Sequence, residues 1–537
     1  MIKGEPLEFS IPEQFNLGSY FLDVNLEEGR GERTALYCGE RRCSYRELWR
    51  LTNRMGNVLK DLGVEPENRV LLVLEDSPEW AAAWLATLKV GAVGTHAYTY
   101  LKPQDYEYLV NLVRPKVVIA DGITLQAVRE GIRASRHPRA VLVAGEDLPP
   151  LGPREYALSA MLERASDSLE PEPTHRDDPA FWNFSGGTTG KSKGVPHMHR
   201  DGLICCEAWN HAFRYRTDDI ILKVPKLFFH YARDIGFLFP LRSGASIILF
   251  RGKATAARIF ELARRHHPTM LINVPTMMRS MIQTPERERA DLSSLHTCIS
   301  SGELLPAALH EEWMRTFGTE VINRYGSAET CMGMLENRPG VARPGSSGRV
   351  TPTVEIKLVD GEGREVPPGQ PGTLIARCAA AGRCYVREHE KSNATFLGNG
   401  WVNTGDVFRQ DENGYFWNLG RADDMVKVSG VWVSPLETEH VLQKCPAVRD
   451  CAVLGIQDRD GLIKLKAFVA LAAGAAGATA IQEELKAYCR ERLAPHKIPR
   501  SIEFLQELPK TGSGKIDRRR LRELDVQGSD AELRAVS

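Results

Sequence analysis

The segment RVLLVLEDSPEWAAAWLATLKVGA, residues 69–92, carries the pattern that decides the fold class. It begins with a run rich in Val and Leu, which predicts a buried strand. In the stretch that follows, Pro78 suits the first turn of a helix and Gly91 suits its end. A buried strand followed directly by a helix is the repeating unit of an α/β fold.

Similar apolar runs recur through the first 420 residues, separated by amphipathic segments and by Gly or Pro. Four of them predict further buried strands: VVIAD (117–121), AVLVAG (140–145), SIILF (246–250) and TMLIN (269–273). The alternation predicts an α/β protein whose large N-terminal domain, residues 1–420, consists of layered sheets and helices.

The character of the sequence changes after residue 420. DCAVLGIQ and KLKAFVAL flank the turn DRDG and predict a hairpin within residues 450–471. The low-complexity tract AAGAAGATA (472–480) is expected to form a surface loop. A helix should follow it, with three residues on one face: Ile481, Leu485 and Tyr488. We therefore expect a small, mobile α+β C-terminal domain over residues 421–537.

The charge balance excludes one class of function. The chain has 69 Lys plus Arg and 69 Asp plus Glu, so it lacks the basic excess that binds nucleic acid or anionic membrane through bulk electrostatics. Its 11 cysteines are too dilute for a disulfide scaffold, and none has zinc-site spacing. The start of the chain has no signal-peptide core, and the longest uncharged stretch, 467–482, is too short to span a bilayer. We expect a soluble cytoplasmic protein.

The segment FSGGTTGKSKGV, residues 184–195, is the richest in chemistry. Its glycines let the backbone approach an anion, its hydroxyls donate hydrogen bonds, and its lysines supply charge. Those residues are Gly186, Gly187, Gly190 and Gly194, then Ser185, Thr188 and Thr189, then Lys191 and Lys193. The combination predicts a loop that holds a polyphosphate, although a flexible Gly/Ser loop is the alternative.

The same loop imitates a Walker A motif. GxxxxGK[ST] requires a glycine five residues before Gly190, and that position holds Ser185. Pro196 and His197 also follow closely, so the loop does not lead cleanly into a helix. A P-loop NTPase is the weaker alternative.

Together with four later segments, the loop resembles the acyl-adenylate-forming ligase superfamily over nearly the whole chain. The four segments are NRYGSAET (323–330), WVNTGDV (401–407), GRADDMVKVSGVWVSPLETE (420–439) and LPKTGSGKIDRRRL (508–521). Within that superfamily three stretches resemble the benzoate-type aryl-CoA ligases: PKLFFHYARDIGF (225–237), NRPGVARPGSSGRV (337–350) and KVSGVWVSP. The resemblance implies an AMP-forming acid–thiol ligase that uses ATP, Mg²⁺ and coenzyme A. In such enzymes a carboxylate attacks the α-phosphate of ATP, and a thiol then displaces AMP.

The resemblance also implies catalytic roles. Lys515 would bridge the carboxylate and the α-phosphate during adenylation, and Glu329 would carry Mg²⁺. Asp423 lies at the hinge about which the small domain rotates. The rotation would bring the loop of Lys427 and Gly430 to the active site for thioester formation.

Nucleotide-binding roles follow in the same way. Asp406 would accept the ribose hydroxyls, Arg421 would assist at ribose and phosphate, and Tyr325 would stack on adenine. A solvated Asp406 and a core Tyr325 are the alternatives. The other implied nucleotide ligands are Ser185, Thr188, Thr189, Gly190, Lys193, Gly302 and Glu303.

Three positions depart from the family pattern. Gly186 replaces a serine and Ser192 a proline in the phosphate loop, and Ala328 replaces the threonine before Glu329. These changes remove hydroxyls and some rigidity, so individual phosphate hydrogen bonds differ. They leave the implied roles of Lys515 and Asp406 intact.

The implied acyl pocket contains His230, Tyr231, Gly302, Gly326 and Met332. Tyr231 matches the benzoate enzymes, whereas His230 stands where they tend to have a small residue and Met332 where a histidine is common. A histidine beside an aryl ring can bond an amino or hydroxyl substituent, and methionine fills irregular space. We therefore expect 2-aminobenzoate as the first candidate acid and hydroxybenzoate as the second. Equally, His230 could gate the thiol tunnel.

Two alternatives for the whole protein remain. One is a stand-alone adenylating enzyme that loads an aryl acid onto the phosphopantetheine of a carrier protein. The other is a nucleotide binder without catalysis. A monomer and a homodimer are both compatible with the sequence.

Overall fold

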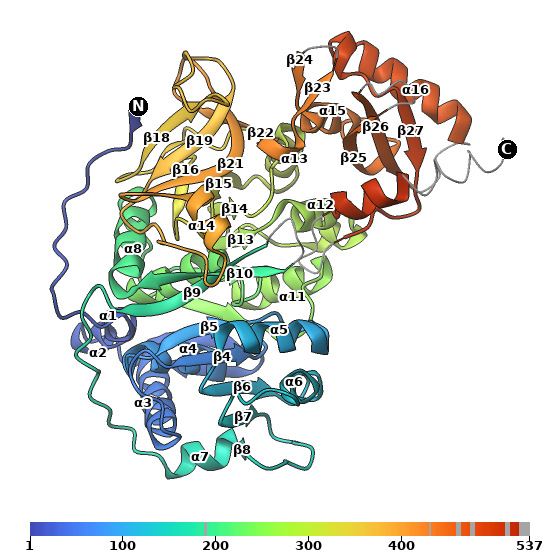
Figure 1. The fold of residues 1–537 in the computed structure, drawn as a ribbon. Coiled ribbons are helices and arrows are strands. Elements are labelled where there is room, and N and C mark those ends of the chain that lie inside the picture. The colour runs from blue at the N-terminus through green and yellow to red at the C-terminus, as the bar shows by residue number, and fades with distance from the viewer. Residues whose placement is uncertain (187–190, 429–430, 458–462, 473–477, 511–515, 526–537) are drawn as a thin grey trace. The chain divides into compact units, whose positions relative to one another are not determined.

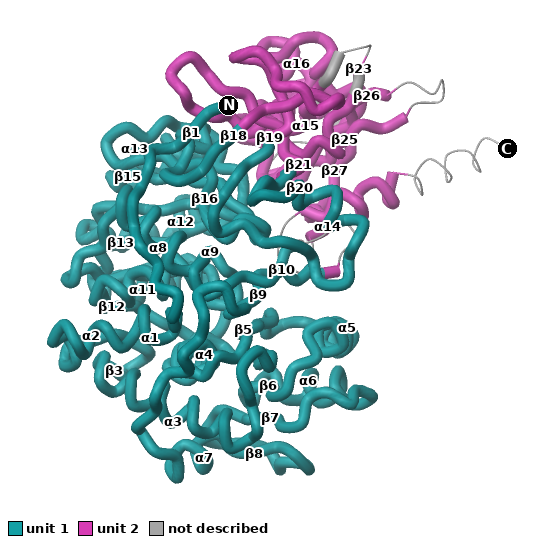
Figure 2. Tube along the Cα trace, turned by 60° about the vertical axis from the view of Figure 1, so that its left-hand side comes forward, with its two compact units in different colours: residues 1–185, 192–356, 375–403 teal, residues 186–191, 357–374, 404–537 magenta. Residues whose placement is uncertain are grey.

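The computed structural model describes residues 1–186, 191–428, 431–457, 463–472, 478–510 and 516–525 (Figure 1). Residue contacts divide the chain into two compact units (Figure 2). Unit 1 comprises residues 1–185, 192–356 and 375–403, and unit 2 comprises residues 186–191, 357–374 and 404–537. Unit 2 thus includes the expected C-terminal domain, and the expected boundary at residue 420 stays a prediction. The α/β fold class is confirmed.

The first sheet of unit 1 is largely parallel. Its strand order is β10-β9-β5-β4-β6-β7-β8, and β9, β5, β4, β6, β7 and β8 are parallel neighbours. The strands are β4 (Arg69–Val73), β5 (Val93–His96), β6 (Val117–Asp121), β7 (Ala140–Ala144), β8 (Glu155–Ala157), β9 (Pro179–Gly186) and β10 (Ser192–Met198). The strands predicted at 69–75, 117–121 and 140–145 are therefore confirmed.

Helices cover this sheet. They are α3 (Tyr45–Asp61), α4 (Pro78–Lys89), α5 (Pro103–Val113), α6 (Leu125–Ile132) and α7 (Leu158–Arg164). Helix α4 follows β4 as predicted: the Ser77 hydroxyl accepts a hydrogen bond from the Trp80 amide at 3.1 Å, and Pro78 occupies the first turn. Gly91 has φ +71°, a left-handed value that glycine adopts without strain. Helices α5 and α6 pack with Leu71 and Val118 in one apolar cluster.

The second sheet of unit 1 has nine strands in the order β17-β16-β15-β14-β13-β11-β12-β2-β3. The six neighbours from β15 to β2 are parallel, and antiparallel strands complete both edges. The strands are β2 (Thr34–Cys38), β3 (Arg41–Ser44), β11 (Ile220–Lys223), β12 (Ser246–Leu249), β13 (Met270–Asn273), β14 (Thr297–Ser300), β15 (Glu320–Gly326), β16 (Gly333–Glu336) and β17 (Arg349–Val350). The strands predicted at 246–250 and 269–273 are confirmed.

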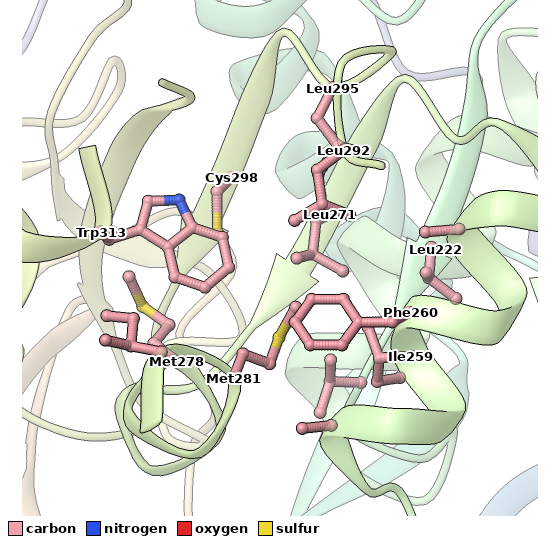
Figure 3. Packing of buried hydrophobic residues seen from close by; sticks show 14 of the residues in the cluster. Leu222, Ile259, Phe260, Leu271, Met278, Met281, Leu292, Leu295, Cys298 and Trp313 are labelled. Atoms are coloured by element: carbon pink, nitrogen blue, oxygen red, sulfur yellow. The ribbon is translucent and has the colours of Figure 1, made fainter. Parts of the chain in front are cut away.

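A large apolar core lies against this sheet. Side chains from β11, β13 and β14 pack with helices α11 (Ala256–His266), α12 (Pro275–Gln283) and α13 (Ala307–Phe317) (Figure 3). Leu271, Met278 and Trp313 are completely buried there. Each buried side chain of this size contributes about 1.5–3 kcal/mol relative to exposure. The core also includes Val321 of β15, so it holds β13, β14 and β15, the three strands whose carboxyl ends carry the candidate site.

The rest of unit 1 consists of shorter elements. These are β1 (Ile2–Lys3), α1 (Leu17–Leu22), α2 (Val24–Glu27), α8 (His199–Phe213), α9 (His230–Arg233), the π-helical turn Asp234–Leu238, α10 (Phe239–Arg242), the 3₁₀ turn Pro285–Arg289, α14 (His389–Thr395) and β20 (Phe396–Gly398). Four strands have residues in both units: β9, β18 (Glu355–Val359), β19 (Gly372–Arg377) and β21 (Trp401–Gln410).

Unit 2 contains the predicted hairpin. Strands β25 (Val448–Gln457) and β26 (Ile463–Leu471) pair antiparallel, and β27 (Ser501–Phe504) joins β26 in parallel. The predicted helical face is confirmed in α16 (Ala478–Arg490), where Ile481 and Leu485 are buried. The other elements are β22 (Phe416–Arg421), the 3₁₀ turn Ala422–Asp424, β23 (Val426–Val428), β24 (Val431–Val433), α15 (Pro435–Leu442) and the 3₁₀ turn Pro495–Lys497.

One expectation for unit 2 needs correction. Residues 478–480, the end of the tract expected to be a loop, form the first turn of α16. Alanine has the highest intrinsic helix propensity, so an Ala-rich stretch directly before an amphipathic segment extends the helix. Residues 473–477 of the tract lie outside the described residues.

Two further sequence predictions concern the whole chain. All 11 cysteines are free thiols, and Cys205 and Cys206 are buried, as expected for core residues. Among the described residues, none of the helices combines the length and the apolar composition that crossing a bilayer requires.

Candidate active site

The predicted phosphate loop joins β9 to β10. Ser185 lies near the end of β9 and Lys193 near the start of β10, and both side chains are half-buried. Residues 187–190, which include Thr188, Thr189 and Gly190, lie outside the described residues. A Walker A loop leads directly into a helix, whereas this loop leads into a strand. The arrangement argues against the P-loop alternative.

Glu329 is held by a segment that no sequence motif marked. The Tyr385 hydroxyl donates a hydrogen bond to Glu329 Oε1 at 2.6 Å, and the Gly382 amide donates to the Glu329 carbonyl at 2.8 Å. The same tyrosine ring lies under Lys193, whose Nζ is 4.0 Å from the ring centroid. Burial and the neighbouring Glu329 carboxylate raise the pKa of the Tyr385 phenol, which therefore stays a hydrogen-bond donor.

The backbone beside Glu329 is held by a buried histidine. His197 Nε2 lies 2.8 Å from the Ala328 carbonyl, and its Nδ1 lies 3.3 Å from Asp201 Oδ2. Burial alone would lower the pKa of His197, but Cys331, the Asp201 carboxylate and the Ala328 carbonyl together raise it to about 9. Because a carbonyl oxygen only accepts, Nε2 carries a proton and donates it to Ala328, and the Asp201 carboxylate favours a second proton on Nδ1. In the sequence, the only signal for this role is that His197 closely follows the phosphate loop.

The end of β15 places the next group of predicted residues. Tyr325 is half-buried, and a register shift follows it, opposite Leu335 and Gly333 of β16. A Cβ on Gly326 would meet the Met332 carbonyl oxygen at 2.6 Å, so only glycine fits. Met332 is buried, with 5% of its surface exposed.

The neighbouring turn after β14 carries Gly302 and Glu303. Gly302 has φ +83°. The Glu303 carboxylate accepts hydrogen bonds from the amide and the hydroxyl of Thr276, both at 3.2 Å, at the start of α12. Glu303 thus caps this helix. Because β13, β14 and β15 are parallel neighbours, these residues share the carboxyl edge of the sheet, where ligands bind in α/β folds.

Two predicted acyl-pocket residues open α9. The Tyr231 hydroxyl lies 3.1 Å and 3.0 Å from the carbonyl oxygens of Asn273 and Ile299. Those carbonyls belong to the ends of β13 and β14. Hydrogen bonding to the strands therefore places Tyr231 at the same carboxyl edge, and half-buried His230 precedes it in the chain.

In unit 2, Asp406 and Arg421 form a pair. They face each other across β21 and β22, with Asp406 Oδ1 3.2 Å from Arg421 Nη1. The same Nη1 donates to the Thr404 carbonyl at 2.8 Å, and the Thr404 hydroxyl accepts from the Asp406 amide at 3.1 Å. Gly405 between them has φ +68°, and a Cβ there would approach the Arg421 guanidinium at 2.7 Å. Sequence reasoning named the pair but did not identify Thr404.

The remaining predicted residues of unit 2 are less completely described. Asp423 is exposed in the 3₁₀ turn Ala422–Asp424, and Lys427 lies in β23 opposite residue 432. Gly430 and Lys515 lie outside the described residues. Lys510 and Ile516, on either side of residues 511–515, form an antiparallel bridge.

The flank after Lys515 is anchored by an ion pair. Arg518 Nη1 lies 2.8 Å from Glu439 Oε1, and Arg518 also donates to the Val453 carbonyl at 3.0 Å. Glu439, in α15, is 97% buried by its neighbours, since only 3% of its surface is exposed. The chain that follows the predicted catalytic lysine is therefore tied to the core of unit 2.

Two family models match the chain. One is the AMP-binding enzyme, over residues 24–386, and the other is the AMP-binding enzyme C-terminal domain, over residues 437–515. The benzoate–CoA ligase of Thauera aromatica is 36% identical over 96% of this chain and 97% of its own length. The 4-hydroxybenzoate–CoA/benzoate–CoA ligase of Rhodopseudomonas palustris is 35% identical over 97% and 96%.

Solved structures of CoA ligases for aromatic acids also resemble this chain. A crystal structure of an anthranilate CoA ligase in complex with anthranoyl-AMP superposes with a TM-score of 0.90 at 36% identity, covering 96% of this chain and 98% of that one. A benzoate CoA ligase from Burkholderia xenovorans superposes with a TM-score of 0.86 at 36% identity, covering 95% and 100%.

Proposed function

Since this chain belongs to the AMP-binding enzyme family and is an AMP-forming aryl acid–CoA ligase, we propose that its acid is a substituted benzoate, with 2-aminobenzoate first and hydroxybenzoate second. The observation that carries the choice of 2-aminobenzoate is the likeness to the anthranilate ligase over 96% of the chain. The histidine at position 230 adds support, because an imidazole ring can form a hydrogen bond with an amino or hydroxyl substituent.

The reaction has two steps. The carboxylate oxygen attacks the α-phosphorus of ATP, the bond to the β-phosphate oxygen breaks, and pyrophosphate leaves. The thiol of coenzyme A then attacks the acyl carbon, and AMP leaves. Both steps gather anions, so placed donors and cations have the largest effect on the rate. In our proposal Lys515 meets the α-phosphate and Lys193 the other phosphates.

Asp406 and Arg421 are proposed as the ribose site. An ionised carboxylate accepts several hydrogen bonds, so the contact with Arg421 at 3.2 Å is compatible with ribose hydroxyls binding the same side chain. The guanidinium keeps Asp406 in one orientation, and its planar fork can also meet a phosphate oxygen.

Glu329 is proposed as the protein ligand of Mg²⁺. No group of three or more His, Cys, Asp or Glu side chains forms a metal site in the part of the chain that the structure describes. A single carboxylate fits Mg²⁺, which usually binds one or two carboxylates and keeps waters and substrate phosphates as its other ligands. The ion, when bound, balances the negative charge of the phosphates.

A panel of acids tests the proposal. Pyrophosphate release is measured with benzoate, with its 2-, 3- and 4-amino and hydroxy derivatives, and with aliphatic acids. We expect the highest kcat/KM for 2-aminobenzoate. A preference for unsubstituted benzoate or for an aliphatic acid would contradict the proposed substrate.

His230→Ala separates the two roles of that histidine. If His230 contacts the ring substituent, pyrophosphate release should fall with 2-aminobenzoate and remain with benzoate. If it gates the thiol tunnel, pyrophosphate release should persist while thioester formation falls with every acid.

A separate experiment identifies the thiol acceptor. The wild-type protein is supplied with coenzyme A and no carrier protein, and detection of the thioester excludes loading of a carrier protein as the only activity.

A further inference from the structure

Tyr385 contacts two oppositely charged residues of unit 1: Glu329, the proposed Mg²⁺ ligand, and Lys193, the proposed phosphate ligand. Its hydroxyl donates to the Glu329 carboxylate at 2.6 Å, and the face of its ring lies 4.0 Å from the Lys193 ammonium. A hydrogen bond to an ionised carboxylate is short and directional, and an ammonium over a ring face is attracted by the ring quadrupole. One side chain thus links an acidic and a basic group from separate motifs.

The segment around Tyr385 is itself fixed. The Ser392 hydroxyl lies 2.9 Å from the Tyr385 amide and 3.2 Å from its carbonyl oxygen. The ring packs edge-on against Phe396 at a centroid distance of 5.1 Å and shares a buried cluster with Val195 and Ala328. The phenol therefore cannot swing away without breaking these contacts.

The backbone of the same segment also reaches Glu329. The Gly382 amide donates to the Glu329 carbonyl at 2.8 Å. A Cβ on Gly382 would lie 2.4 Å from the Val195 side chain in β10, so glycine lets this segment pack closely against Val195. Backbone and side chain of Glu329 are thus both held from residues 382–385.

We propose that Tyr385 is a positioning residue for magnesium-bound ATP: its hydroxyl orients the Glu329 carboxylate toward the metal, and its ring holds the Lys193 ammonium in place for phosphate. The proposal rests on the proposed function of Glu329 and Lys193. Tyr385 acts through these two residues and does not itself contact substrate. Partners that orient a metal ligand typically change metal affinity or activity by about 10- to 100-fold when they are lost.

Tyr385→Phe removes the hydroxyl and keeps the ring under Lys193. The dissociation constants of Mg²⁺–ATP and of ATP in excess EDTA are measured by calorimetry. We expect the variant to bind Mg²⁺–ATP about 10- to 100-fold more weakly and metal-free ATP unchanged. The Mg²⁺ concentration for half-maximal pyrophosphate release should rise, while the KM for the aryl acid stays constant.

Tyr45→Phe is the matched control. Its phenol also lies in hydrogen-bond contact with backbone carbonyls, those of Leu241 and Ala245, and it is fully buried. We expect this variant to lose thermal stability and to keep the wild-type preference for Mg²⁺–ATP. A general loss of packing would instead shift both variants alike.

A double variant shows whether Tyr385 acts through Glu329. Tyr385→Phe combined with Glu329→Gln should bind Mg²⁺–ATP no more weakly than Glu329→Gln alone. Additive losses, equal weakening for ATP with and without Mg²⁺, or an unchanged Mg²⁺ dependence would overturn the proposal. If the wild type releases no pyrophosphate with any acid, the proposed function fails, and the calorimetric comparison still decides the role of Tyr385.

Discussion

Glu336 has a buried carboxyl group, and replacing it with glutamine should stabilise unit 1 above neutral pH. Only 2% of its surface is exposed, and neither carboxylate oxygen has a hydrogen-bond partner among the described residues. The cation opposite it on β15 is Arg324, whose Nε lies 3.9 Å away. Burial raises the pKa of Glu336 to about 7, although Arg324 and Arg338 act in the opposite direction.

The size of the effect follows from this pKa. The ordinary value is 4.5 and the folded value is about 7, so the difference of 2.5 units corresponds to ~3 kcal/mol. Because the folded pKa is raised, the stabilising contribution is fully present below pH 4.5 and is lost as the pH rises through 7. Between these values the free energy of unfolding should fall by about 1.4 kcal/mol per pH unit relative to the glutamine variant.

Urea denaturation from pH 5 to pH 8 measures this difference. Tryptophan fluorescence suits the assay, because Trp209 of unit 1 packs 4.7 Å from the Arg324 guanidinium. The control is Glu312→Gln, at an exposed site on α13. We expect Glu336→Gln to match the wild type near pH 5, corrected for the control, and to exceed it by up to ~3 kcal/mol at pH 8. If the variant is less stable than the wild type at pH 8, attraction to Arg324 outweighs burial and the reasoning is refuted.

Three further changes test other parts of the structure. Gly326→Ala should cost about 1–3 kcal/mol in urea denaturation, because the new Cβ would lie 2.6 Å from the Met332 carbonyl oxygen; wild-type stability would contradict the close approach. Arg518→Ala leaves the buried Glu439 carboxylate without its cationic partner and should destabilise unit 2 by about 3–5 kcal/mol; Glu439→Gln in the same chain should recover part of the melting temperature, and no recovery would show that another contact matters. Lys515→Ala should abolish pyrophosphate release and preserve conversion of supplied acyl-adenylate to thioester; equal loss of both half-reactions would argue against two catalytic conformations.

The elements that sequence reasoning found correctly are those whose signal is local. Strands such as β4 and β13 are short apolar runs, and α4 begins with the helix-capping residue Ser77 followed by Pro78. The prediction for the alanine-rich tract was wrong at residues 478–480, because low complexity and helix propensity coincide in alanine. The Ala-rich tract and the amphipathic segment after it both favour a helix, so the local sequence does not show at which residue the helix begins.

In the candidate site, too, local motifs identify some residues and miss others that are distant in the sequence. Glu329, Asp406 and Arg421 are marked by short motifs, because the proposed phosphate and ribose chemistry demands those residue types. Tyr385 is 56 residues from Glu329 along the chain, and His197 is 131 residues from Ala328. No spacing in the sequence connects such partners, since they meet only after the sheets and loops have packed.

The sequence by itself therefore determined the α/β class, the family and the residue types that an acid–CoA ligase needs. Only the tertiary structure decided which neighbours hold those residues. The Tyr385 hydroxyl donates a hydrogen bond to Glu329, the Thr276 amide donates to Glu303, and the Thr404 carbonyl accepts from Arg421. The physical reason is that residue type sets what a group can bond, whereas a hydrogen bond forms only within a few tenths of an ångström of its ideal length. Packing between distant segments sets positions to that accuracy.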